Sequence, residues 1–346
     1  MKRHYDFVYL TNTPSFYKLN LCDEIAREAS VLLVFYGYGA EAVNTELRGE
    51  GKFRFDYVFL NEEDSNKRNK LAVFFRLLRL MSVIHAKQIL FSGWLAPEYN
   101  LFSFLSPRKR NVIVCESSVW DISLTGIKGA LKKAVISRMA DALPSGEPHK
   151  QFFTSIGFKG KTNITGSVGI FRKGTRRATI PNAPLRFIYV GRLIDVKNVS
   201  LLIDVFNRNG KLLTIVGKGN LEDRLKAMAQ PNITFTGFIN NEQLGEVYQR
   251  HDVFILPSKY EPWGLVVEEA IYWGLPVIVS DKVGSSIDIV QNLGTGRIFK
   301  SGDPDALAEA VNAIEKDYQH YKDAVDAVDW KERDRRQVNA YLDLLS

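Results

Sequence analysis

Short apolar runs alternate with longer amphipathic segments along the whole chain. The runs are rich in Val, Ile, Leu, Phe and Tyr, which is typical of strands buried in a parallel sheet. They predict strands over 7–10, 31–36, 57–60, 88–91 and 112–115 in the first half, and over 186–190, 212–216, 233–236, 253–256, 276–279 and 297–299 in the second. Apolar residues at helical spacing predict helices over 18–29, 67–86 and 128–140, and helices that begin near 199, 221, 242, 265 and 305.

Strands that alternate with helices in this way are typical of parallel βαβ units. We therefore predict an α/β protein built from two Rossmann-like domains that face each other across a cleft. The basic segment 172–184 contains two prolines and is expected to connect them. This gives a first domain over 1–174 and a second over 175–325, followed by a C-terminal helix over 326–346 that is a candidate to pack back on the first domain.

Charge is concentrated in one half of the chain. Residues 1–174 hold 25 Lys and Arg against 16 Asp and Glu, a net charge of +9, whereas residues 175–346 carry −2 of the total of +7. A basic domain indicates an anionic partner. We expect a phosphorylated substrate or an anionic membrane surface and no nucleic acid, because the sequence contains no RNP-like, helix-turn-helix or zinc-finger motif.

Cysteine usage and hydropathy favour a cytoplasmic protein. Cys22 and Cys115 lie far apart and outside any CxxC motif, so neither a disulfide framework nor a zinc site is expected. The N-terminal apolar run is short and contains Asp6, and we interpret it as a first strand rather than a signal peptide. No stretch of the sequence is long and apolar enough to span a membrane.

The segment 258–280, SKYEPWGLVVEEAIYWGLPVIVS, contains the most informative candidate site. Glu261 is expected in a loop and Glu269 in the following helix, with Gly264 between them. A helix N-terminus attracts anions through its backbone N–H groups and its dipole, and each carboxylate could accept hydrogen bonds from sugar hydroxyls. The alternative is an ordinary βαβ unit whose helix carries two solvated glutamates.

Two further loops carry candidate ligand groups. Arg192 and Lys197 follow the strand 186–190 and precede a helix, where cations oppose the helix dipole. A bound anion would explain them, and the alternative is that Asp195 pairs with one of them at the surface. The glycine-rich turn 217–219 alone is a weak signal, and Phe238 lies in a turn whose main chain could pass along a flat base.

The order of these motifs, YVGRLIDVKN, IVGKGN, ITFTGFI, the segment 252–281 and GTGRIFKSGDPDALAEAV, resembles retaining glycosyltransferases of family 4, which have the GT-B fold. The resemblance covers residues 186–315 and implies a nucleotide-sugar donor bound mainly by the second domain. It implies that Arg192 and Lys197 hold the donor diphosphate, Glu269 the ribose hydroxyls and Glu261 the transferred sugar. The backbone amides of Gly264, Leu265 and Val266 would face the sugar and phosphate.

The first half resembles the family more loosely. Residues 13–16, including Ser15, occupy the place of a double glycine that many members have near the donor phosphate. Glu116 stands where many members have a histidine near the donor sugar. Glu116 could accept a hydrogen bond from a sugar hydroxyl or act on the acceptor, and the alternative is a loop carboxylate without a role. The histidines His85 and His149 are expected to have surface roles.

No cofactor or metal is expected. Asp303 and Asp305 have the letters of a metal-binding DxD motif but stand where a helix N-cap is predicted. Arg192 and Lys197 could balance the diphosphate charge, so no divalent ion is required.

The resemblance therefore implies transfer of a sugar from a nucleoside-diphosphate sugar to a hydroxyl group of an acceptor, such as a glycan. The basic first domain would suit an acceptor carried on a polyprenyl diphosphate, as in bacterial surface-polysaccharide biosynthesis. The alternatives are a nucleotide-sugar epimerase of the same fold, and a non-catalytic partner subunit, which only Glu116 and the altered first loop favour.

The segment 66–87 is predicted to be a basic helix with a wide apolar face. Such a helix either covers the sheet or lies in a membrane interface.

Overall fold

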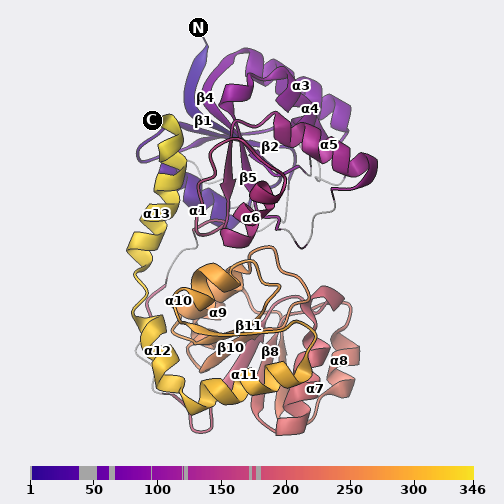
Figure 1. Cartoon of the computed structure of the whole chain (residues 1–346), viewed down its shortest axis with the longest axis vertical. Coiled ribbons are helices and arrows are strands. Elements are labelled where there is room, and N and C mark those ends of the chain that lie inside the picture. Colours follow the sequence, from indigo (N-terminus) through magenta and orange to yellow (C-terminus); the bar gives the residue numbers. More distant parts are fainter. Residues whose placement is uncertain are drawn as a thin grey trace. The chain divides into compact units, whose positions relative to one another are not determined.

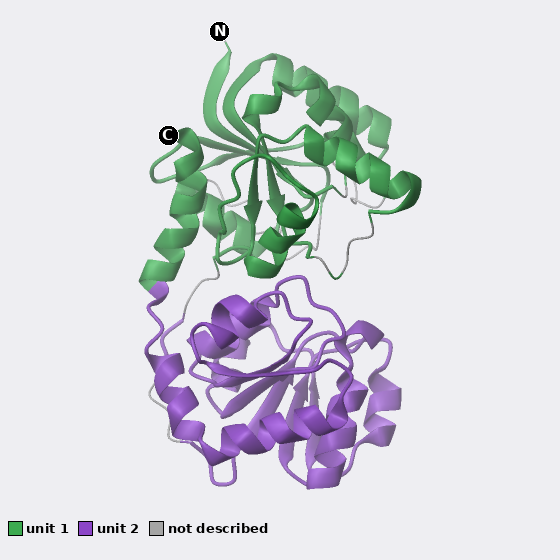
Figure 2. Ribbon diagram, viewed as in Figure 1, with its two compact units in different colours: residues 1–172, 331–346 green, residues 173–330 purple. Residues whose placement is uncertain are grey.

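The computed structural model describes residues 2–38, 53–61, 67–94, 96–118, 120, 124–170, 174–176 and 181–346. The chain divides into two compact units (Figure 2). Unit 1 comprises residues 1–172 together with 331–346, and unit 2 comprises residues 173–330. The chain therefore leaves unit 1 once and returns to it near its end.

The described residues of unit 1 form a sheet of six parallel strands in the order β3-β2-β1-β4-β5-β6 (Figure 1). The strands are β1 (Arg3–Thr11), β2 (Val31–Phe35), β3 (Asp56–Phe59), β4 (Ile84–Ser92), β5 (Asn111–Cys115) and β6 (Asp141–Pro144). The helices are α1 (Phe16–Ile25), α3 (Lys70–Ser82), α4 (Pro97–Leu105), α5 (Gly126–Ser137), α6 (Glu147–Ser155) and α13 (Trp330–Leu342).

Helices cover both faces of this sheet. Successive side chains of a strand point to opposite faces, and in these strands both sets are largely apolar. In β1, Phe7 and Tyr9 pack with α1 and α13, whereas Val8 and Leu10 pack with α3 to α6 on the opposite face. Tyr341 places α13 in the same core layer as α1. Cys22 and Cys115 are both buried and free.

Several elements of unit 1 differ from the predicted ones. The helix expected over 67–86 ends at Ser82, because Ile84 and Ala86 are buried at alternate positions and begin β4. The helices α4 and α6 and the short strand β6 were not predicted. The strand β6 lies at the sheet edge and ends in Pro144, whose missing N–H is tolerated there.

Unit 2 contains a second parallel sheet, in the order β12-β11-β10-β7-β8-β9. Its strands are β7 (Arg186–Val190), β8 (Leu212–Val216), β9 (Ile233–Gly237), β10 (Val253–Leu256), β11 (Val277–Ser280) and β12 (Gly296–Phe299). Its helices are α7 (Val199–Asn209), α8 (Glu222–Met228), α9 (Asn241–Tyr248), α10 (Leu265–Tyr272), α11 (Pro304–Lys316) and α12 (Tyr318–Asp326).

The predicted α/β class and the two Rossmann-like modules are confirmed. All six strands expected in the second half are present within two residues of their predicted bounds. No helix among the described residues is long and apolar enough to cross a membrane.

In both sheets the strand order reverses next to the first strand of the module, between β1 and β4 in unit 1 and between β7 and β10 in unit 2. Ligands of such sheets bind beyond the carboxyl ends of the strands at this point.

Candidate functional site

The loop after β10 in unit 2 is held by both of its neighbours at the carboxyl edge of the sheet. The N–H of Lys259 donates to the carbonyl of Val196, in the loop after β7, at 2.8 Å. The N–H of Glu261 donates to the carbonyl of Lys282, after β11, at 3.0 Å, and the Glu261 carbonyl accepts from Gly284 at 2.9 Å. These backbone bonds fix the position of Glu261 at the strand-order switch.

The side chain of Glu261 forms an ion pair with Lys197. The two side chains are only 15 % and 13 % exposed, respectively, so solvent screens the pair weakly. The alternative that Asp195 pairs with Arg192 or Lys197 is wrong, because Asp195 pairs with Lys259 at 2.8 Å. The structure thus brings together two residues that the sequence placed in separate candidate groups.

Gly264 is the N-cap of α10 and adopts φ +89° and ψ +60°. A Cβ atom there would lie 3.0 Å from Cγ1 of Val283 and 3.2 Å from Cγ of Glu261. Glycine is therefore required both for the left-handed backbone and for the close approach of the Glu261 side chain. Leu265 and Val266 begin α10, where the first N–H groups of a helix have no intrahelical acceptor and can bind an anion.

The adjacent glutamates of α10 have different surroundings. Glu268 is buried, and its carboxylate accepts a hydrogen bond from the indole N–H of Trp263 at 3.3 Å. Glu269 is only partly buried, one position further along the helix. Of the two, Glu269 is therefore the one whose position allows contact with a ligand.

Arg192 is exposed and forms no ion pair with any described residue in the structure. Its backbone is fixed by Tyr189, a buried residue whose hydroxyl donates to the Arg192 carbonyl at 3.0 Å. Burial and the negative charge of Glu261 raise the pKa of Tyr189, so its hydroxyl remains a donor. Tyr189 was not predicted as a site residue, because in the sequence it resembles any other apolar residue of a buried strand.

Glycines allow the loops after β7, β8 and β9 to pack backbone against backbone. The N–H of Gly217 donates to the carbonyl of Gly237 at 2.8 Å, and a Cβ atom on Gly217 would lie 1.9 Å from the Gly191 carbonyl oxygen. These contacts explain the glycines without a ligand. Phe238, directly after β9, is 69 % exposed and leaves its ring available at this edge.

Unit 1 has a polar group at its own strand-order switch, centred on Lys18 of α1. The Lys18 ammonium donates to Ser92 Oγ at the end of β4 at 2.8 Å and to Thr11 Oγ1 at the end of β1 at 3.4 Å. It also lies 3.7 Å from the carboxylate of Glu116, after β5. Glu116 is therefore paired with Lys18, a residue that was not predicted to belong to a site. Ser15 is the N-cap of α1 without a side-chain capping bond.

Two other expectations are settled by burial and capping. His149, expected at the surface, is fully buried in α6, so that expectation is wrong. Asp303 is the N-cap of α11, and its carboxylate accepts from the N–H groups of Asp305 and Ala306 at 3.1 and 3.0 Å, as the helix-capping interpretation predicted.

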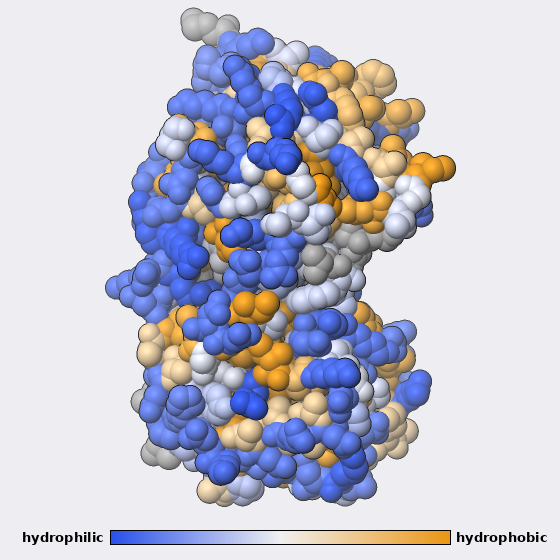
Figure 3. Space-filling model, in the orientation of Figure 1, coloured by the Kyte–Doolittle hydropathy of each residue, from blue (hydrophilic) through white to orange (hydrophobic). Residues whose placement is uncertain are grey.

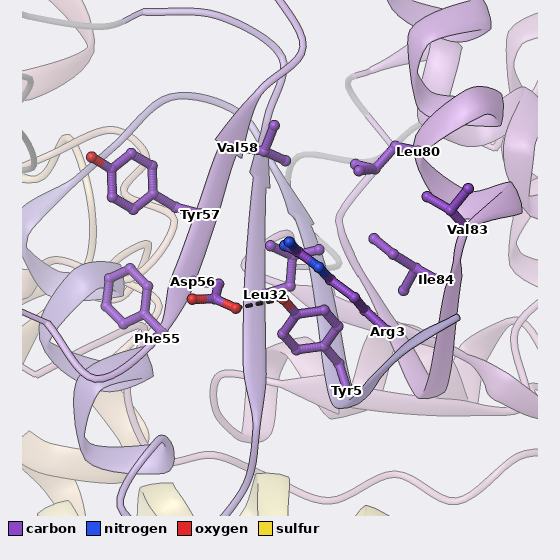
Figure 4. A pocket seen from close by; sticks show the side chains of 10 residues that line it. All are labelled: Arg3, Tyr5, Leu32, Phe55, Asp56, Tyr57, Val58, Leu80, Val83 and Ile84. Atoms are coloured by element: carbon purple, nitrogen blue, oxygen red, sulfur yellow. Dashed lines mark hydrogen bonds between the residues drawn. The ribbon is translucent and has the colours of Figure 1, made fainter. Parts of the chain in front are cut away.

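A cavity of about 450 Å³ lies at the opposite, amino-terminal edge of the sheet of unit 1 (Figure 4). Arg3 and Tyr5 line it, and the Tyr5 hydroxyl donates to Asp56. Ligands of parallel α/β sheets bind at the carboxyl edge, so this cavity is not part of the candidate site.

Comparison with known proteins agrees with the geometry of unit 2. Residues 172–329 match the family model described as glycosyl transferases group 1. An uncharacterized glycosyltransferase of Methanocaldococcus jannaschii is 27% identical over 208 residues, which are 55% of this chain and 50% of that protein. A GDP-mannose-dependent alpha-mannosyltransferase of Mycobacterium tuberculosis is 34% identical over 142 residues, 40% of this chain and 37% of that protein. The matches thus span half or less of these curated relatives.

Solved structures resemble the whole chain at low identity. The apo form of the lipopolysaccharide outer core galactosyltransferase WaaB superposes with a TM-score of 0.71 and 15% identity, over 97% of this chain and 99% of that chain. Anabaena HepE in complex with UDP-glucose gives a TM-score of 0.69 and 15% identity, over 99% and 98%. The chain has the two-domain GT-B fold of these solved structures, and its residues 172–329 match the family model of the group 1 glycosyl transferases.

Proposed function

We propose that this protein is a retaining glycosyltransferase that moves a sugar from a nucleoside-diphosphate sugar to a hydroxyl group of a glycan or of a lipid-linked acceptor. The observation that carries the proposal is the Lys197–Glu261 ion pair at the strand-order switch of unit 2. It lies beside the start of α10, which can receive an anion, and in the same edge as the exposed Arg192.

In this proposal the site stabilises charge as the bond between sugar and diphosphate breaks. Arg192, Lys197 and the first N–H groups of α10 meet the growing negative charge of the leaving diphosphate, where most of the rate enhancement is expected. The carboxylate of Glu261 orients the sugar and stabilises positive character at its anomeric carbon. Retention follows when the acceptor hydroxyl attacks from the face that the diphosphate leaves, with a phosphate oxygen accepting its proton.

The remaining donor contacts are assigned by position. Glu269 would accept hydrogen bonds from the ribose hydroxyls, and the exposed ring of Phe238 lies where a nucleobase could stack. A relative named for GDP-mannose and a similar solved structure in complex with UDP-glucose support a nucleotide-sugar donor, but they differ in the base and the sugar.

The acceptor is assigned to unit 1, which carries most of the positive charge. Ser15, Lys18 and Glu116 lie at its carboxyl edge, and Glu116 could accept a hydrogen bond from a hydroxyl of either substrate. A polyprenyl-diphosphate-linked acceptor in surface-polysaccharide biosynthesis would place the protein in the cytoplasm at the inner face of the membrane. The lipopolysaccharide galactosyltransferase among the structural relatives is consistent with that pathway.

The experiment is a thermal-shift screen of the full chain against UDP, GDP and ADP. A ligand at 100 times its dissociation constant stabilises the folded protein by about 2.7 kcal/mol, so one nucleotide should raise the melting temperature. Nucleotide sugars with the responding base are then incubated with the protein, with and without candidate acceptors, and released nucleotide is measured. Absence of any shift contradicts the proposed donor site, and binding without release or transfer indicates a non-catalytic subunit.

A further inference from the structure

Three neighbouring helices of unit 1 expose large apolar side chains. Among the described residues, seven of the twelve exposed large hydrophobic side chains lie on these helices. They are Leu71 (68 %) and Phe75 (65 %) of α3, Leu101, Phe104 and Leu105 of α4, and Ile127 (82 %) and Leu131 (63 %) of α5. Figure 3 shows hydrophobic surface gathered over the region of α3 to α5. Contiguous apolar surface of this kind usually marks an interaction site.

The exposed side chains lie on one face of each helix. Leu71 and Phe75 are four residues apart, as are Ile127 and Leu131, and Leu101, Phe104 and Leu105 have the same helical spacing. Helix α4 contacts both α3 and α5. The three faces therefore belong to one surface, which we call the α3–α5 face.

Arginine side chains connect the ends of two of these helices. Arg108 donates to the carbonyl of Ser137 at 3.0 Å, and Arg138 donates to the carbonyl of Ser106 at 3.2 Å. These bonds hold α4 and α5 together, so the α3–α5 face is formed before any partner binds.

The fold does not need the exposed side chains for its core. In α3, Val73 and Leu77 are fully buried against the sheet, whereas Leu71 and Phe75 point to solvent. The helix therefore covers the sheet with one apolar strip, as one of the two interpretations predicted, and exposes a second apolar strip to solvent.

The border of the α3–α5 face is positively charged. Residues 67–82, 97–110 and 124–138 contain twelve Lys and Arg and a single acid, Glu98. Glu98 is buried and pairs with Arg68 at 2.5 Å, so these described segments expose no carboxylate. Lys70, Lys128 and Lys133 are exposed beside the apolar side chains.

We infer that the α3–α5 face binds the surface of an anionic lipid bilayer, with its Leu, Ile and Phe side chains among the acyl chains and its lysines at the headgroups. Apolar faces bordered by Lys and Arg are suited to this interface, where the hydrophobic and electrostatic contributions act together. A second copy of the chain is a poorer partner, because pairing two such faces would bring like charges together. This inference extends the proposed function, and it rests on that proposal for the existence of a lipid-linked acceptor.

The test is co-sedimentation of the full chain with vesicles of phosphatidylcholine mixed with phosphatidylglycerol, and with phosphatidylcholine alone. Two apolar variants, L71Q/F75Q and I127Q/L131Q, are compared with L212Q, whose side chain is 41 % exposed in unit 2. A charge variant, K128Q/K133Q, is compared with K226Q in unit 2.

We expect the wild type and both controls to bind the anionic vesicles, and each apolar variant to lose about tenfold in partitioning. The charge variant should bind the anionic vesicles more weakly than the wild type at low salt. Part of the wild-type binding should persist as salt rises, because salt does not screen the contribution of the apolar side chains. The inference is overturned if the wild type does not bind, if the apolar variants bind like L212Q, or if they abolish a wild-type dimer instead.

A nucleotide thermal shift on the same samples separates this inference from the proposed function. Nucleotide binding without vesicle binding would support the transferase proposal and contradict membrane binding by the α3–α5 face. Vesicle binding without a response to any nucleoside diphosphate would support membrane binding by this face and contradict the proposed donor site.

Discussion

The ammonium group of Lys197 and the carboxylate of Glu261 form an ion pair between two loops that follow adjacent strands, β7 and β10. The pair couples the group proposed to hold diphosphate with the group proposed to face the sugar. Either side chain alone would be a partly buried, unpaired charge, which is costly. The two residues should therefore respond differently to substitution from the exposed Arg192.

Lys197→Ala should reduce both stability and diphosphate affinity, whereas Arg192→Ala should reduce affinity alone. Removal of the ammonium group leaves the Glu261 carboxylate unpaired, at a cost of roughly 1–3 kcal/mol in unfolding free energy. Arg192 is exposed, and its loss should change stability by less than about 0.5 kcal/mol. Urea unfolding and calorimetric titration with nucleoside diphosphate measure the two effects. Lys259→Ala, which removes the pair with Asp195, is the control and should leave affinity unchanged. Wild-type affinity in both variants would refute the donor assignment.

Glu261→Gln should lower turnover strongly while nucleotide affinity changes little. The substitution keeps the shape and removes the charge that stabilises positive character on the sugar in the transition state. Because Lys197 loses its counter-charge, any change in diphosphate affinity should be toward tighter binding. Steady-state kinetics and calorimetry on the same preparation test this. A parallel loss of nucleotide binding and turnover would make Glu261 a nucleotide ligand.

Gly264→Ala should destabilise the protein more than Gly302→Ala. Both glycines have positive φ, +89° and +81°, so each alanine should cost about 1–2 kcal/mol in backbone strain. A Cβ atom at Gly302 meets nothing within 4 Å, whereas at Gly264 it crowds Val283 and Glu261. The difference between the two unfolding free energies reports the crowding, and only Gly264→Ala should reduce transfer. Equal stability and activity in both variants would contradict the close packing at the start of α10.

Asp303→Ala should lower stability by about 1 kcal/mol and leave transfer intact. The reason is loss of the two capping hydrogen bonds at the N-terminus of α11. Transfer by the wild type should also survive excess EDTA, because the proposed mechanism balances the diphosphate charge with Arg192 and Lys197. Metal-dependent transfer that Asp303→Ala abolishes would instead make Asp303 and Asp305 a metal site.

The free energy of unfolding should fall as pH falls below about 6.5, in part through His251. Burial lowers the pKa of this imidazole from its usual 6.5, and its nitrogens lie 2.7 Å from the Val247 carbonyl and 2.8 Å from Thr214 Oγ1. The unfolded chain then binds the proton at higher pH than the folded protein does. This contribution is present above pH 6.5 and is lost below it, by at most about 1.4 kcal/mol per pH unit. His251→Gln should flatten the profile from urea unfolding in this range, and an unchanged slope would exclude His251 as its source.

Much of unit 2 could be predicted because its central strands β7, β10 and β11 are almost wholly apolar and buried and because its turns are marked by glycine. The capping role of Asp303 followed from its place before an amphipathic helix. The pairing of Lys197 with Glu261 could not be predicted from spacing, because 64 positions separate them and only the strand order makes their loops neighbours.

The elements and the site residues of unit 1 were harder to predict from the sequence, and three examples show the physical reasons. The short strand β6 contains Pro144, and its place in the sheet is set by pairing with β5. The end of α3 was misplaced because an apolar sequence continues from Met81 into Ile84, where the period changes from helix to strand. Lys18 is one cation among many in the sequence, and only the fold brings Ser92 and Thr11 to it.

The return of the chain to unit 1 affects the order in which the protein can fold during synthesis. Val338 and Tyr341 belong to the core layer that contains Leu19 and Cys22, so this layer stays incomplete until residues 331–346 have left the ribosome. Unit 2 is continuous over 173–330 and has emerged by then. We therefore expect unit 2 to become protease-resistant first in ribosome-bound chains that stop at residue 330 and continue into a flexible linker that fills the exit tunnel, which reverses the usual order in which N-terminal domains fold before later ones.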